Sequence, residues 1–169
     1  RDNVESRGLE MCIRDRIIAG VMNSNLRQYA RRELKSRGKK CNCINCRELW
    51  RAHIDPSTAD LKEIKYKSSG GDEYFLSYES GSKLLGYLRL RLDDNATVRE
   101  LKVTGQAANI GKTGTGVQHM GLGSKLMKVA EEKAKGYAKI RVTHGPGTRL
   151  YYEKLGYSLE DYYMVKNLP

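Results

Sequence analysis

The sequence has no long apolar run, and this absence argues against a membrane-spanning helix. None of its apolar stretches approaches the roughly 20 residues that a helix needs to cross a bilayer. Proline is scarce, with three residues in 169, and the chain has one Trp and one Phe. Acidic residues are outnumbered by Lys and Arg, 20 against 31, which gives a net charge of +11. We expect one domain with a basic surface and no membrane partner.

Cysteine is also rare, and its placement is uneven. The chain has four, and three of them, Cys41, Cys43 and Cys46, lie within six residues. Secreted disulfide proteins spread their cysteines along the chain, so we expect a reducing, cytoplasmic compartment. Three clustered thiols among cations suit zinc, which takes four ligands, with His53 and His144 as candidates for the fourth. Inert or redox-active thiols are the alternative.

Positive charge is concentrated before a turn at Asp55-Pro56-Ser57. Residues 17–53 carry nine Lys or Arg against two Glu, a net charge of +7. A helix is predicted over residues 25–37, with Asn23 or Ser24 as its cap and Gly38 as its stop. Its cations predict a surface for the phosphates of RNA, and a basic helix that meets no nucleic acid is the alternative. The predicted RNA-binding residues are Arg27, Arg31, Arg32, Lys35, Lys39 and Lys40.

The chain is expected to have three parts. Residues 1–16 contain a run that resembles translated sequencing adapters, so they form an artefact or an N-terminal arm and are excluded from the argument. Residues 17–56 form the basic helix and a cysteine-rich linker. Residues 57–169 form the main domain, with four strands at 63–68, 73–79, 83–92 and 97–104. A loop at 106–117, a helix at 121–135, a strand at 138–143, a helix at 148–155 and a strand at 157–165 follow.

The most informative motif is the run Gln118-His119-Met120-Gly121-Leu122-Gly123, which opens the helix at 121–135. Glycines have no Cβ to hold a ligand away, and the first turn of a helix leaves its N–H groups unpaired. A pyrophosphate can therefore bind there. A glycine-softened helix start is the alternative for these six residues alone. Nearby matches to nucleotide-binding loops fail because Gln106 and His119 occupy positions that require glycine.

This motif resembles the pyrophosphate loop of the GCN5-related N-acetyltransferases, and the order of elements resembles their core. The resemblance implies an α+β fold, with a central, mostly antiparallel sheet that contains one splayed parallel pair of strands, at 97–104 and 138–143. Acetyl-CoA would lie between those strands. The implied cofactor-binding residues are Leu101, Val103, Gln118, His119, Met120, Gly121, Leu122, Gly123, Ser124 and Tyr152.

A closer resemblance follows from several motifs in order. They include Cys41-x-Cys43-x-x-Cys46-Arg47-Glu48, Gly86-Tyr87-Leu88-Arg89-Leu90-Arg91 and Gly147-Thr148-Arg149-x-Tyr151-Tyr152. Over about residues 17–168 the sequence resembles the C-terminal half of the catalytic subunit of Elongator, in its archaeal or bacterial form. That resemblance implies a domain of a tRNA carboxymethyluridine synthase, which acts on the wobble uridine at position 34.

Members of that family also carry an N-terminal radical S-adenosylmethionine domain, whose iron–sulfur cluster is held by Cys-x-x-x-Cys-x-x-Cys. No such spacing occurs in this sequence, so we expect a fragment of the full enzyme. A residue of the absent domain is then another candidate for the fourth zinc ligand. Tyrosines on the helix at 148–155 are expected to protonate the departing thiolate, first Tyr152 and then Tyr151, with core packing as the alternative. His119 would contact the cofactor, lie beside RNA or face solvent.

Glu100 is the candidate base, acting directly or through water, and a salt bridge to an arginine such as Arg149 is the alternative. Two other functions remain open: a protein lysine acetyltransferase, and a non-catalytic RNA-binding module stiffened by zinc. A net charge of +7 repels basic histone-type tails and attracts tRNA, which favours the tRNA enzyme. The oligomeric state is open between a monomer and a homodimer.

Overall fold

A computed structural model describes residues 25–49, 54–104 and 121–169. The predictions made for residues 1–16, for the cap at Asn23 or Ser24 and for the loop at 106–117 lie outside these ranges. The described residues belong to two units that divide between Asn42 and Cys43, and each is described by itself. Within the described ranges, no helix is long and apolar enough to cross a membrane.

The first unit contains the predicted basic helix, α2 (Leu26–Ser36). None of its residues is buried, and Leu26 and Tyr29 are each 53% exposed. Gly38 ends it as predicted. Its φ of +65° is a conformation that glycine adopts without strain, and the N–H groups of Gly38 and Lys39 donate to the carbonyls of Lys35 and Leu34. The helix therefore presents its side chains, four of which are basic among eleven, to solvent within its own unit.

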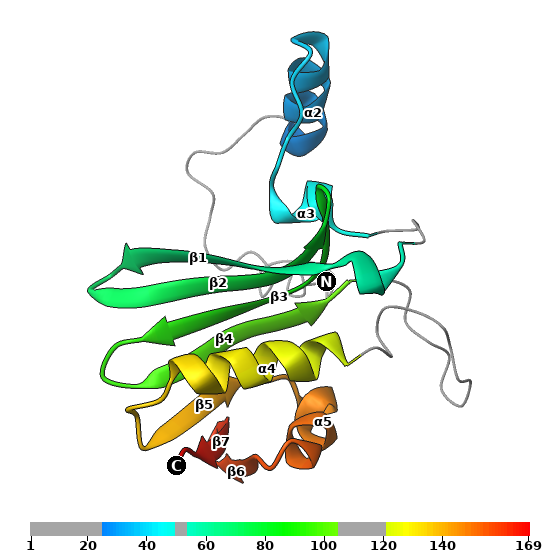
Figure 1. The fold of residues 1–169 in the computed structure, drawn as a ribbon. Helices are drawn as coiled ribbons and strands as arrows, with labels where there is room; N and C mark the ends of the chain where they lie inside the picture. The colour runs from blue at the N-terminus through cyan, green and yellow to red at the C-terminus, as the bar shows by residue number, and fades with distance from the viewer. Residues whose placement is uncertain (1–24, 50–53, 105–120) are drawn as a thin grey trace, which may run out of the picture. The chain divides into compact units, whose positions relative to one another are not determined.

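The second unit is built on one mixed sheet with the strand order β1-β2-β3-β4-β5-β7-β6. The first four strands form an antiparallel meander, as the short turns between them predicted (Figure 1). A short helix and a 3₁₀ turn precede the sheet: α3 (Ile44–Arg47) and η1 (Pro56–Thr58). The strands are β1 (Asp60–Ser68), β2 (Gly71–Ser80), β3 (Lys83–Leu92), β4 (Ala96–Val103), β5 (Lys139–Thr143), β6 (Ser158–Glu160) and β7 (Tyr163–Asn167).

The splayed parallel pair is confirmed. Strands β4 and β5 run parallel but pair only from Ala96 opposite Ile140 to Val98 opposite Val142. Beyond Val98, β4 continues for five residues with no β5 partner among the described residues. The two strands therefore separate toward their carboxyl ends, where the resemblance predicted the cofactor.

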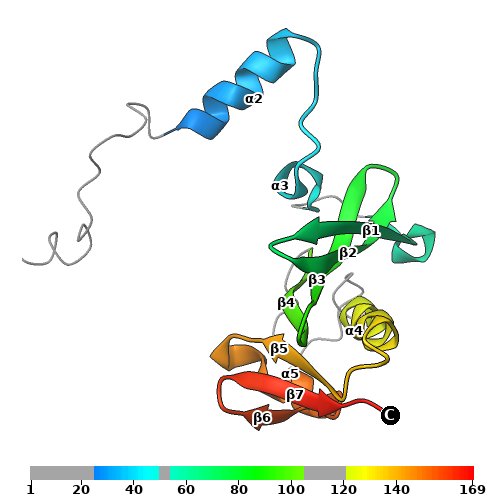
Figure 2. The ribbon, with the colours of Figure 1, turned by 90° about the vertical axis from the view of Figure 1, so that its left-hand side faces the viewer.

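The core lies between one face of the sheet and α4 (Leu122–Lys133). Leu126, Met127 and Ala130 of α4 are buried against the apolar faces of β2 to β5. Leu126 packs directly over Gly86 in β3, because a Cβ at Gly86 would lie in ordinary contact with it, at 3.6 Å. Figure 2 views α4 almost along its axis, on one side of the sheet. We call this side the helical face and the other the open face.

The C-terminal region differs from the prediction in one respect. The single strand expected at 157–165 is a hairpin of β6 and β7, which follows η3 (Pro146–Thr148) and α5 (Arg149–Lys154). Its turn has no glycine or proline. Instead Asp161 adopts a left-handed φ of +52°, which a short polar side chain tolerates, and Tyr162 is 87% exposed. No glycine or proline marks this turn in the sequence, so the predicted strand continued through it.

Candidate functional site

A cavity of about 380 Å³ lies where β4 leaves β5 and where α4 begins. The sheet contributes apolar side chains, α4 contributes backbone, and η3 and α5 contribute hydroxyl groups. Its lining contains seven of the predicted site residues, together with Thr148, which the predictions did not include. The lining residues are Leu101, Val103, Gly121, Gly123, Ser124, Thr148, Tyr151 and Tyr152. The adjacent Leu122 is buried at the first position of α4.

A β-bulge in β4 gives this cavity its apolar wall. In the pairing with β3, Arg89 lies opposite Glu100 and Leu90 lies opposite Val98, so Arg99 is an extra residue without a partner. An extra residue reverses the alternation of side chains. Val98 is in the core on the helical face, and after the bulge Leu101 and Val103 face the same side. Glu100 is thereby directed to the open face.

The bulge is held by a buried carboxylate. Glu73 in β2 is fully buried, and its Oε1 accepts hydrogen bonds from Arg99 at 2.7 Å and from Arg91 at 3.3 Å. A buried carboxylate is costly unless it is paired, so these two arginines stabilise it. This interaction joins residues 26 positions apart, and no local sequence pattern indicated it.

The N-terminus of α4 forms another wall of the cavity. Gly121 precedes the helix with a φ of +68°, and its carbonyl accepts from the N–H of Lys125 at 2.9 Å. Among the described residues, no side chain caps this end. The N–H groups of the first turn have no acceptor within the helix, and they carry partial positive charge. This end of α4 can therefore bind an anion, and it borders a cavity with apolar walls.

Gly123 also has a steric role. A Cβ at this position would lie 2.6 Å from the hydroxyl oxygen of Tyr151 and 3.5 Å from its Cζ. The Tyr151 hydroxyl therefore lies against the first turn of α4. Burial raises the pKa of Tyr151, and the neighbouring Ser124 side chain partly opposes that rise. Gly123 thus accommodates a tyrosine, whereas the sequence had indicated only a ligand phosphate.

Tyr152, the first candidate for the acid, lines the same cavity but is only 5% exposed. Its ring packs edge-on against those of Tyr151 and Tyr157, at centroid distances of 5.1 and 6.0 Å. Burial raises the pKa of Tyr152 to about 12, so its hydroxyl keeps its proton at neutral pH. Tyr152 is thus both a core residue and a part of the cavity wall, and its role as an acid stays a prediction.

Glu100 lies where β4 has separated from β5, as predicted, but on the open face. It accepts a hydrogen bond from the Tyr87 hydroxyl and lies 3.7 Å from Arg89. Burial, together with the bond to Glu100, raises the pKa of Tyr87, so this tyrosine is a stable donor. The alternative partner Arg149 instead pairs with Glu153 at 2.9 Å. The role of Glu100 as a base stays a prediction.

The three clustered cysteines are a candidate metal site. Their sulfur atoms all lie within 4.8 Å of one another. In a tetrahedral zinc site with Zn–S bonds of about 2.3 Å, the sulfurs lie about 3.8 Å apart, so this spacing fits three zinc ligands. Among the described residues the group contains no histidine. His53 lies outside the described residues, and the fourth ligand stays open.

The residues after the cysteines are tied to the sheet by ion pairs. Arg47 forms an ion pair with the buried Glu79 of β2, and Glu48 pairs with Lys102 of β4 at 2.6 Å. Burial alone would raise the pKa of Glu79, but hydrogen bonds, first from Arg47, hold it below its usual value. Sequence reasoning included Arg47 and Glu48 in a motif without assigning them a contact. Lys102 lies between the lining residues Leu101 and Val103, so this segment contacts the strand that forms the cavity wall.

The remaining predicted residues are placed as follows. All six predicted tRNA-binding cations are exposed, on α2 or just after it, and they stay predictions: Arg27, Arg31, Arg32, Lys35, Lys39 and Lys40. Gln118, His119 and Met120 lie outside the described residues, and their contacts with a cofactor stay predictions too.

Comparison with known proteins agrees with this geometry. Residues 44–157 match the model of the acetyltransferase (GNAT) family. The chain is 40% identical to the tRNA uridine(34) acetyltransferase of Methanocaldococcus jannaschii, over 90% of the chain and 32% of that relative. It is 38% identical to the human Elongator complex protein 3, over 90% of the chain and 32% of that relative. The resemblance to Elongator that the motifs indicated is therefore confirmed.

A solved structure extends the agreement to three dimensions. The archaeal Methanocaldococcus infernus Elp3 with an N-terminal deletion matches with a TM-score of 0.73 and 38% identity, over 89% of this chain and 41% of that one. The chain thus spans about a third of the length of the curated relatives it matches.

Proposed function

Because this chain belongs to the GNAT family of acetyltransferases, we propose that it is the acetyl-CoA-binding part of an enzyme that modifies uridine 34 of tRNA. The observation that carries the proposal is the cavity at the start of α4. It combines a helix N-terminus that no described side chain caps, and that can bind phosphate, with two apolar side chains on a strand that has separated from its neighbour. The names of relatives at about 40% identity supply the tRNA substrate.

In this proposal each wall of the cavity has a separate task. The first-turn N–H groups of Leu122, Gly123 and Ser124 bind the pyrophosphate. Leu101 and Val103 pack against the pantetheine chain, whose amides can pair with the edge of β4 that no described strand occupies beyond Val98. Acetyl-CoA supplies a reactive thioester when bound. The residues of this chain orient it and exclude water around it.

The catalytic groups lie on opposite faces of the sheet. Tyr151 and Tyr152 border the cavity on the helical face, and both keep their protons at neutral pH because burial raises their pKa values. Either can protonate a departing thiolate, with Tyr152 as our first candidate. Glu100 lies on the open face, where the acceptor or a water would approach it. The gap between β4 and β5 would connect the two faces.

The exposed cations on and after α2 would bind the tRNA backbone, in the cytoplasm where tRNA is modified. A zinc ion at Cys41, Cys43 and Cys46 would stiffen the segment that precedes Arg47 and Glu48. The radical chemistry of the full enzymes needs an iron–sulfur cluster, for which this sequence has no motif. We therefore propose that this chain alone binds tRNA and hydrolyses acetyl-CoA, and that it does not carboxymethylate uridine.

The test is acetyl-CoA hydrolysis by the purified chain, followed as release of free CoA thiol with and without tRNA. We expect slow hydrolysis that tRNA accelerates and that Tyr152→Phe reduces. Binding of acetyl-CoA with no hydrolysis under either condition would instead identify a non-catalytic module. Faster transfer to a basic histone-type peptide than to water in the presence of tRNA would identify a lysine acetyltransferase.

A further inference from the structure

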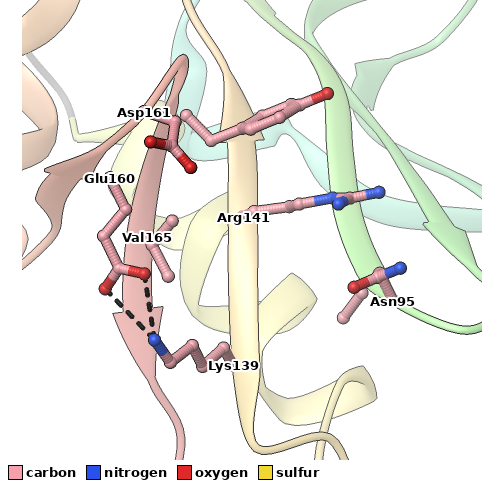
Figure 3. Close-up of a pocket in the computed structure, with 8 residues that line it drawn as sticks. Asn95, Lys139, Arg141, Glu160, Asp161 and Val165 are labelled. Atoms are coloured by element: carbon pink, nitrogen blue, oxygen red, sulfur yellow. Dashed lines mark hydrogen bonds and ion pairs between the residues drawn. The ribbon is translucent and has the colours of Figure 1, made fainter.

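A second cavity lies on the open face of the sheet, at the end away from the acetyl-CoA cavity. It has a volume of about 260 Å³ and is formed by β5, the β6–β7 hairpin and the turn before β4 (Figure 3). The residues that line it are Asn95, Ala96, Lys139, Arg141, Glu160, Asp161, Tyr163 and Val165. None of them belongs to the site described above.

Arg141 is the main polar group of this cavity, and the fold holds its side chain in place. Its Nε donates to the Thr97 hydroxyl at 2.7 Å, and its guanidinium lies 4.9 Å from the ring centre of Tyr163. A guanidinium with a fixed stem loses little entropy when its remaining N–H groups bind an acceptor. The two Nη groups carry those remaining donors.

Arg141 also differs from its charged neighbours in its partners. In the part of the chain that the structure describes, no carboxylate lies within ion-pair distance of Arg141. Arg91 and Arg99 reach Glu73, and Lys139 reaches Glu160 at 2.9 Å. A half-buried cation in a cavity, whose hydrogen bond and ring contact come from the neutral side chains of Thr97 and Tyr163, favours an anionic ligand.

The polar side chains of this cavity form two groups, and one of these groups suits a phosphate. Figure 3 shows the side chains of Arg141 and Asn95 on one side of β5, and Asp161 with the Lys139–Glu160 pair on the other. The half with Arg141 and Asn95 therefore offers a cation and an amide, away from the two lining carboxylates. Asp93, in the same turn as Asn95, forms its ion pair with Arg91, which holds the pKa of Asp93 below its ordinary value, and the positive charge of Arg141 adds to this effect.

We propose that this half of the cavity binds a backbone phosphate of tRNA through Arg141 and Asn95. The inference rests on the proposed function, because it takes tRNA as the substrate. Residues Ala96 and Val103 mark the two ends of β4, so the two cavities lie on the order of 20 Å apart along that strand. That distance equals about six phosphate steps along a nucleic-acid strand, so one folded RNA can reach both cavities.

The test measures the binding of tRNA to the whole chain by fluorescence anisotropy across a series of salt concentrations. We expect Arg141→Gln to weaken binding by about tenfold at low salt and to lower the slope of log K against log salt by about one. Arg141→Lys should keep that slope and lose part of the affinity, because a lysine cannot reproduce the fork of donors. Asn95→Ala should weaken binding by a smaller factor.

Two controls make the result specific. Lys128→Gln removes one exposed charge of α4, which packs on the helical face and not on the open face that holds this cavity, and it should change binding by less than about twofold. Acetyl-CoA affinity should be unchanged in every variant. Equal tRNA affinity in wild type, Arg141→Gln and Asn95→Ala would overturn the inference. If the wild-type chain bound no tRNA at all, the proposed function itself would fail.

Discussion

At the scale of single residues, Gly123 has the sharpest steric constraint in the acetyl-CoA cavity. A Cβ there would meet the Tyr151 hydroxyl at 2.6 Å, whereas the next ring atom is 3.5 Å away. The hydroxyl alone thus creates the conflict. Because Gly123 has no Cβ, the backbone of α4 and the Tyr151 hydroxyl can both lie at the cavity wall.

This geometry predicts a coupling between the two residues. Gly123→Ala should be destabilising in the wild-type background, where overpacking offsets the gain of about 1 kcal/mol from helix propensity. In a Tyr151→Phe background the same change should be neutral or stabilising. Thermal unfolding of the four proteins measures the difference, for which we expect at least about 1 kcal/mol. Additive effects would show that the hydroxyl does not occupy this place.

The two tyrosines can be separated by kinetics. Tyr152→Phe removes only a hydroxyl, so if Tyr152 is the acid the turnover should fall by a factor of about 10² or more while acetyl-CoA affinity changes little. Tyr151→Phe serves as the matched variant. A larger fall in turnover for Tyr151→Phe would move the role to that residue, which lies nearer the start of α4.

The pH dependence of stability follows from the same burial. The pKa of Tyr152 is raised to about 12 in the folded chain, against about 10 in an unfolded one. A raised pKa stabilises the fold below pH 10, and this contribution is lost as the pH rises from 10 to 12. Between pH 10 and pH 12, the unfolding temperature of Tyr152→Phe should therefore fall less steeply than that of the wild type.

At the scale of elements, the segment after the cysteines is a structural brace for β4. Glu48 is buried, and Lys102 is its partner at 2.6 Å. Leu49 is also buried and packs in a small cluster with Leu85 and Leu122, and Val103 packs against that cluster. This segment thus contacts both the strand and the helix that form the cavity.

Breaking the ion pair between Glu48 and Lys102 should therefore weaken the binding of acetyl-CoA. Lys102→Met leaves the buried Glu48 carboxylate without its partner, and we expect a loss of about 1 to 3 kcal/mol in stability together with weaker acetyl-CoA binding. Glu48→Gln in the same chain should restore part of both. Lys128→Met, on the exposed side of α4, is the control and should change neither. Unfolding temperatures and calorimetric titrations measure the two effects.

The sequence predicted the regular elements well and the long-range contacts poorly. Alternation and turns placed β3 at its observed bounds, and the helix expected at 121–135 is present as α4. The bulge at Arg99 was not visible, because it depends on the register with β3 and on Glu73 in another strand. The β6–β7 turn was missed because Asp161 replaces the expected glycine.

In the candidate site too, residues in a local motif were predicted and residues brought together by strand pairing were not. Leu101, Val103, Gly121, Gly123 and Ser124 were predicted from a motif and its resemblance, and the cavity brings them together. The cavity around Arg141 was not predicted, since it joins four segments that share no motif. Local patterns specify elements, whereas such a site depends on how the strands pair.

At the scale of the whole molecule, the account describes one sheet with two sites on its two faces. In the proposed function, the helical face would hold acetyl-CoA at the separated ends of β4 and β5, and the open face would offer Glu100 and the cavity around Arg141 to the RNA. The cofactor and the acceptor would then meet where these two strands separate. The position of acetyl-CoA is the claim on which the rest of the account depends.

Calorimetric titration of acetyl-CoA into the wild-type chain and into Gly121→Val tests that claim most directly. Gly136→Val is the matched control, because Gly136 at the other end of α4 also has a positive φ, +107°, and nothing within 4 Å of a Cβ. We predict that wild type and Gly136→Val bind acetyl-CoA alike and that Gly121→Val loses about 1.5 to 3 kcal/mol of binding free energy. Unchanged affinity in a folded Gly121→Val chain would contradict the placement of the cofactor at the start of α4.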